Sequence, residues 1–114
     1  MASAELQKVL RIMQERRDAA QGAPPPDIAA MRANMERTAF PVSPETTVTD
    51  LEVAGVPAEW VCAPSADSSR RLLYLHGGGY VMGSPTTHRE LASRISQASA
   101  CAVLVLDYRM APEH

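Results

Sequence analysis

Three glycines in a row, Gly77, Gly78 and Gly79, follow directly on an apolar stretch at residues 71–75. Glycine loses more backbone entropy on folding than any other residue, so such a run is expected where the chain must adopt unusual φ angles or approach another group closely. The apolar stretch before it has the length of a buried strand. The sequence therefore predicts a strand that ends in a glycine loop.

The residues after the loop complete a strand–helix–strand unit. Pro85 suits the first turn of a helix, and Leu91 and Ile95 are predicted to lie on its apolar side. Residues 101–106 form a continuous apolar run that is typical of a parallel strand covered on both faces. Such a unit requires a sheet with helices on both sides, so the predicted fold class is α/β.

The first 44 residues are predicted to contain two helices. Apolar residues at steps of three and four predict one helix over residues 3–17, with Ser3 as its N-cap. A second helix is predicted to begin after Asp27 and to end before Pro41. The two helices are expected to form either a hairpin over a core or a mobile cap.

The segment between these helices and the glycine loop is rich in Thr and Val. Residues 46–53 and 56–62 are predicted to form two antiparallel strands, and residues 64–69 a polar loop.

Charge and cysteine content exclude several classes of protein. Eleven Lys and Arg against thirteen Asp and Glu give a net charge of −2, which argues against a nucleic-acid partner. Cys62 and Cys101 lack a CxxC spacing and are too few for a disulfide framework, which favours a cytoplasmic protein. The charged N-terminus has no signal-peptide pattern, and no apolar run approaches the roughly 20 residues of a membrane span.

Glycine loops of this kind serve three chemistries. A Walker-type phosphate loop needs a lysine, and none follows. A dinucleotide site is favoured by Gly77, Gly79 and Gly83, and by Asp107 at the end of the next strand. That site would place Pro85 inside its helix, where proline costs about 3 kcal/mol. An oxyanion hole remains, in which backbone N–H groups face an oxygen that becomes negative during acyl transfer.

Two motifs resemble the hormone-sensitive-lipase-like esterases, a branch of the α/β-hydrolase fold. Residues 76–84, HGGGYVMGS, are similar to the oxyanion loop of that family. Residues 107–114, DYRMAPEH, resemble its DYRLAPEH segment, with Met110 in place of the usual Leu. The resemblance implies cap helices in residues 1–44 and the first half of the hydrolase core, an antiparallel strand pair and then a mostly parallel sheet, in residues 45–114.

The resemblance also implies roles for the loop residues. The N–H groups of Gly78 and Gly79 would bind the oxyanion, and Gly77 would let the chain turn. His76 would shape the loop, while the general base lies much later in the chain of such enzymes.

The remaining polar and aromatic candidates have weaker signals. Tyr80 and Met82 are candidates for lining the substrate pocket, with packing as the alternative. Asp107 and Arg109 are interpreted as structural side chains that anchor a turn, and His88 is expected at the surface.

The nucleophile, acid and base of the fold are not found in these residues. The fold needs a serine in a GxSxG turn, then an acid and a histidine. Ser84 comes closest, but Pro85 follows it and no second glycine completes the turn. We therefore expect the N-terminal part of a longer enzyme, inactive by itself, whose strand at residues 101–106 leaves an apolar edge uncovered.

The predicted function is serine carboxylesterase activity on short- to medium-chain esters, with the glycine loop and part of the cap supplied by this chain. The substrate is a small-molecule ester, no metal or organic cofactor is expected, and a homodimer stays open. The alternative is a catalytically inactive hydrolase-like module that binds a small molecule or another protein.

Overall fold

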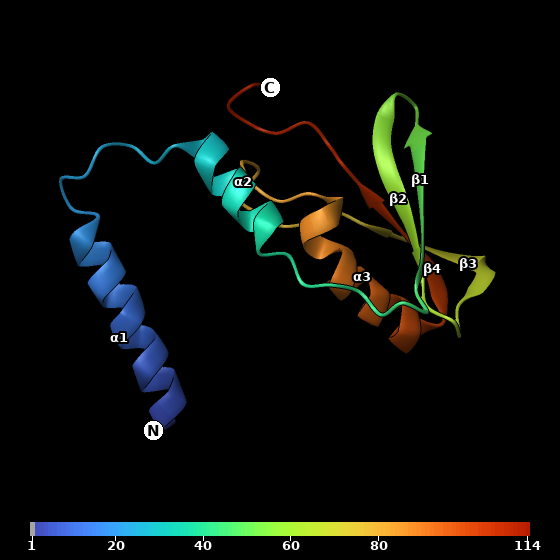
Figure 1. Ribbon diagram of the computed structural model, residues 1–114, viewed down its shortest axis with the longest axis horizontal. Helices are drawn as coiled ribbons and strands as arrows, with labels where there is room; N and C mark the ends of the chain where they lie inside the picture. The colour runs from blue at the N-terminus through green and yellow to red at the C-terminus, as the bar shows by residue number, and fades with distance from the viewer. Residues whose placement is uncertain (1) are drawn as a thin grey trace.

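The computed structural model describes residues 2–114 and consists of three helices and a four-stranded sheet (Figure 1). In chain order the elements are α1 (Ala4–Ala19), α2 (Ile28–Arg37), β1 (Thr47–Val53), β2 (Val56–Cys62), β3 (Asp67–Tyr74), α3 (Pro85–Ser99) and β4 (Cys101–Leu106). The two predicted N-caps are confirmed, because Ser3 accepts a hydrogen bond from the Leu6 N–H and Asp27 accepts one from the Ala30 N–H.

The strand order is β1-β2-β4-β3, and only β3 and β4 run parallel to each other. β4 pairs with β2 on one side and with β3 on the other. The expectation of an uncovered edge at residues 101–106 is therefore wrong. Because the antiparallel pair β1–β2 docks beside β4, the parallel unit leaves β3 at the margin of the sheet.

β3 differs from the predicted buried strand in its start and its burial. It begins at Asp67, so residues 67–69 belong to the strand and not to the predicted polar loop. A shift in register against β4 occurs between Asp67 and Arg71. Leu73 and Leu75 are 58% and 59% exposed. Only one face of β3 is covered, because α3 packs on that side.

The core lies between α3 and the sheet. Its fully buried members are Val61, Ala92, Val103 and Val105, and Leu72, Tyr74 and Ile95 pack against them. The helix contributes small residues here, which lets it approach the strands closely. Leu91 is 44% exposed, so its predicted place on the core side is wrong, whereas the prediction for Ile95 is confirmed.

The two N-terminal helices do not form a hairpin. α1 has no buried residue and stands away from the rest of the molecule, whereas α2 lies beside the start of α3 (Figure 1). Over residues 2–114, no helix is both long and apolar enough to cross a bilayer.

Candidate active site

The glycine loop follows β3 and leads into α3, and it contains three consecutive positive φ angles. These are +132° at Gly78, +63° at Gly79 and +62° at Tyr80. The Gly78 carbonyl accepts hydrogen bonds from the N–H groups of Val81 and Met82, at 3.2 and 3.0 Å. A Cβ on Gly78 would lie 1.9 Å from the Met82 carbonyl oxygen, so this turn requires glycine.

A pocket of ≈ 380 Å³ lies against this loop. Its walls come from the end of β3, from the loop and from the segment after β4, and they comprise Leu75, His76, Gly77, Gly78, Gly79, Tyr80 and Tyr108. Met82 is outside this lining, and its N–H closes the turn instead. Within residues 2–114, no hydrogen bond uses the N–H of Gly78 or Gly79 as its donor.

His76 is buried behind the glycines, with 3% of its surface exposed. Its Nδ1 lies 2.9 Å from the Gly77 carbonyl oxygen, and the two groups can bond only if Nδ1 carries the proton. Its ring stacks on that of Tyr108, with centroids 4.3 Å apart, and on that of His88 at 5.3 Å. The imidazole thus holds the backbone at the start of the glycine run, which fits a loop-shaping residue.

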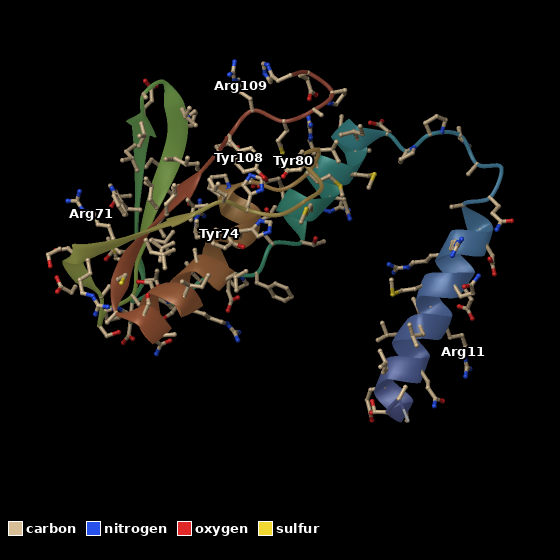
Figure 2. All side chains as sticks on the ribbon, turned by 180° about the vertical axis from the view of Figure 1, so that it is seen from behind. Arg11, Arg71, Tyr74, Tyr80, Tyr108 and Arg109 are labelled. Atoms are coloured by element: carbon tan, nitrogen blue, oxygen red, sulfur yellow. The ribbon has the colours of Figure 1, made fainter. Side chains whose placement is uncertain are left out.

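Tyr108 belongs to the site, although no role was predicted for it. Its hydroxyl donates a hydrogen bond to the His76 carbonyl oxygen at 2.5 Å, and burial raises its pKa. Figure 2 shows its side chain in the same region as those of Tyr74 and Tyr80. The only signal in the sequence was its position inside the second motif.

His88 was predicted at the surface, and this prediction is wrong, because the side chain is half-buried beside His76. Its Nδ1 lies 2.9 Å from Thr87 Oγ1 and 3.4 Å from the Ser84 carbonyl oxygen. Burial lowers its pKa below the ordinary value, and the neighbouring His76 acts in the same direction. Its place in the first turn of α3 turns it toward the end of β3.

The segment after β4 runs along the loop. The Ala111 N–H donates to the Tyr80 carbonyl oxygen at 2.8 Å, and the Ala111–Pro112 peptide bond is cis. Asp107 and Arg109 are exposed, and their side chains form no hydrogen bond or ion pair with other residues of the described part of the chain. The backbone therefore anchors this segment, and the predicted anchoring by these two side chains is wrong. Figure 2 shows Arg109 pointing outward.

Arg32 of α2 joins three parts of the site, and no local pattern in the sequence points to it. Its Nε donates to the Val81 carbonyl oxygen and its Nη2 to that of Ala111, both at 2.7 Å. The same guanidinium contacts Glu113 through two hydrogen bonds of 2.8 and 3.1 Å. This pairing raises the pKa of Arg32 and lowers that of Glu113.

Ser84 is a helix cap in this structure. The Ser84 Oγ accepts a hydrogen bond from the Thr87 N–H at 3.2 Å, and Thr87 Oγ1 accepts one from the Ser84 N–H at 2.9 Å. The Ser84 hydroxyl also donates a hydrogen bond to the Glu36 carboxylate. These contacts fit a structural hydroxyl and not a nucleophile. Among residues 2–114, no three His, Cys, Asp or Glu side chains are placed to share a metal ion.

A sheet in the order β1-β2-β4-β3, with α3 connecting its two parallel strands and a glycine loop after β3, belongs to the α/β class of folds. Residues 72–114 match the model of the α/β hydrolase fold family.

Similar proteins narrow this class. The chain is 41% identical over 114 residues to the acetyl-hydrolase of Streptomyces hygroscopicus, and this alignment covers 99% of the chain and 37% of the acetyl-hydrolase. It is 45% identical to an esterase/lipase from an uncultured bacterium of known structure, with 99% of this chain and 38% of that one covered and a TM-score of 0.78. It is 42% identical to an esterase from the bacterial hormone-sensitive lipase family, with 99% of this chain and 37% of that one covered and a TM-score of 0.77.

The chain has the α/β hydrolase fold, and the proteins it is similar to include an esterase of the bacterial hormone-sensitive lipase family. It spans somewhat more than a third of the length of the relatives it matches.

Proposed function

We propose that this chain supplies the oxyanion hole and part of the substrate cap of a serine carboxylesterase that acts on short- to medium-chain esters. One observation carries the proposal. Gly78 and Gly79 line a pocket of ≈ 380 Å³, and within residues 2–114 their N–H groups donate no hydrogen bond. Two donors without an acceptor beside a pocket suit an oxygen that gains negative charge.

In the proposed reaction a serine attacks the ester carbonyl, and a histidine removes the serine proton. The serine, the acid and the histidine would come from sequence that these 114 residues do not contain. As the carbonyl carbon becomes tetrahedral, its oxygen would accept hydrogen bonds from Gly78 and Gly79. One such donor contributes about 2.7–4 kcal/mol of transition-state stabilisation.

The pocket and the relatives support a small acyl substrate. A volume of ≈ 380 Å³ is at the lower end of ligand pockets, which span about 300–1,000 Å³. Tyr80 is 77% exposed at its rim and is the proposed substrate contact. One similar structure is that of EstE5 crystals soaked with p-nitrophenyl butyrate, at 45% identity. The helices of residues 1–44 would form the cap.

A chimera tests this function. The segment of the Streptomyces hygroscopicus acetyl-hydrolase that aligns with this chain is replaced by this chain, and p-nitrophenyl butyrate hydrolysis is measured. We expect turnover by the chimera and none by the 114-residue chain alone. Acylation of the isolated chain would contradict the proposal. A folded chimera that binds the ester without hydrolysing it would favour the inactive binding module instead.

A further inference from the structure

Arg32 connects the helix α2 directly to the glycine loop. It precedes Val81 of the loop by 49 positions, yet its guanidinium bonds to the loop and to the segment after β4. Its side chain is 26% exposed. Because four hydrogen bonds hold its guanidinium, this side chain has a defined position.

The three partners of Arg32 match the guanidinium fork. Glu113 takes two hydrogen bonds, and the carbonyl oxygens of Val81 and Ala111 take one each. The planar group carries five N–H donors in a fixed geometry, which an ammonium group cannot reproduce. The arrangement therefore selects arginine and not merely a positive charge.

The two carbonyl contacts lie on either side of the most strained part of the loop. Val81 follows Tyr80, whose φ is +62°, and Ala111 donates its N–H to the Tyr80 carbonyl oxygen at 2.8 Å. A non-glycine residue in this region persists only where its surroundings fix it. Arg32 binds the next residue of the loop and the partner of Tyr80 at once, so it fixes both.

We propose that Arg32 is a positioning residue for ester hydrolysis, which holds the glycine loop in the conformation that presents the Gly78 and Gly79 N–H groups. This inference rests on the proposed esterase function. It makes the chemical step depend on the seating of α2. Because Arg32 is not part of the pocket lining, its loss should affect kcat more than KM.

The same helix offers a matched control. The Arg37 guanidinium also makes a hydrogen bond, but to Asn34 of its own helix at 2.7 Å. Arg32→Lys and Arg37→Lys therefore make the same chemical change on α2, and only the first removes contacts to the loop. Glu113→Gln is a milder variant, because it leaves Arg32 and its two carbonyl contacts in place.

The experiment measures kcat, KM and hydrogen exchange of residues 76–84 in the chimera. For Arg32→Lys we expect kcat to fall at least about tenfold with KM nearly unchanged, since small misplacement of catalytic groups costs up to about 100-fold. Exchange in the loop should accelerate. Arg37→Lys should change neither quantity, and Glu113→Gln should give a smaller change of the same kind.

The outcomes separate this inference from the function itself. If the chimera with native Arg32 folds and hydrolyses no ester, the esterase proposal is refuted. The contact between Arg32 and the loop is still supported in that case if hydrogen exchange of the loop is slow and only Arg32→Lys accelerates it. An active chimera in which Arg32→Lys and Arg37→Lys behave alike overturns the positioning role. If Arg32→Lys does not fold, Arg32→Gln replaces it, because glutamine also lacks the guanidinium fork, and an unchanged kcat and loop exchange in that variant overturn the role.

Discussion

His88 is the residue whose titration is expected to make the stability of the site depend on pH. Its ring lies 5.3 Å from that of His76, and burial lowers its pKa. The hydrogen bond to the Ser84 carbonyl opposes this shift, and the neighbouring His76 adds to it. The folded chain therefore binds the His88 proton less readily than the unfolded chain, whose pKa stays near 6.5.

This difference sets the sign of the pH dependence. Below pH ~6.5 the unfolded chain takes up a proton at His88 while the folded chain does not, so the free energy of unfolding falls as the pH drops. The contribution of His88 is fully present above that pH and is lost as the pH approaches the lowered pKa of the folded state. We predict that the urea midpoint decreases between about pH 7.5 and 5.5, and that His88→Gln reduces the decrease.

His114→Gln is the control for this prediction, because His114 is an exposed imidazole away from the ring stack. If it reduces the pH dependence as much as His88→Gln does, the burial of His88 is not the cause.

At the residue scale, local chemistry was predictable and long-range partners were not. Ser3 and Asp27 act within their own helix turn, so their caps follow from neighbouring sequence. Arg32 acts on Glu113, 81 positions away, and Tyr108 acts on His76, 32 positions away. No periodicity links such pairs, because only the fold brings them together.

Among the structural elements, the glycine loop contains two neighbouring glycines that differ sharply in the space available for a side chain. Gly78 has no room for a Cβ, because the Met82 carbonyl oxygen would be 1.9 Å away, whereas nothing lies within 4 Å of a Cβ on Gly79. Both have positive φ, so alanine at either position carries a backbone strain of about 1–3 kcal/mol. Only Gly78→Ala must also displace the backbone of the turn.

We predict that Gly78→Ala lowers kcat of the chimera about 100-fold or more, as expected for a lost oxyanion donor, and that Gly79→Ala lowers it by less than tenfold. Gly55→Ala is the control, since Gly55 has φ +80°, an open Cβ position and a place in the β1–β2 turn. Its kcat should not change. Equal losses in Gly78→Ala and Gly79→Ala would show that the shape of the turn does not govern the reaction.

The elements themselves were largely predictable, and β3 shows where pattern reading ends. β2 and β4 have the predicted bounds, because turn residues or a continuous apolar run delimit them. β3 includes the polar residues 67–70, which lie at a sheet margin and need no apolar face. Its burial depends on which strands flank it, and that is a property of topology and not of its own sequence.

The molecule as a whole is more extended than a compact domain, and some of its apolar surface is exposed. The radius of gyration is 17.1 Å, whereas a compact domain of this length has about 13 Å. α1 accounts for much of the difference, since it stands apart from the sheet, as the place of Arg11 in Figure 2 illustrates. Two apolar surfaces are exposed: the stripe on α1 and the margin of the sheet at β3.

The margin of the sheet is the more effective surface for association. β3 pairs with β4 on one side, and within residues 2–114 no strand pairs with its other side, so its backbone N–H and C=O groups can bond to another strand. Leu73 lies on the face opposite Leu72 and Tyr74, which pack under α3, and it is 58% exposed. A second copy of the chain would satisfy both the backbone and this leucine.

We predict that the 114-residue chain self-associates with rising concentration in sedimentation velocity, and that Leu73→Lys suppresses this, because a lysine at a strand edge opposes pairing. Leu10→Lys provides the matched control on α1, where Leu10 is 53% exposed. It makes the same change in charge and volume without touching the sheet. If Leu10→Lys suppresses association and Leu73→Lys does not, the helix stripe joins the copies and the free strand edge is not the adhesive surface.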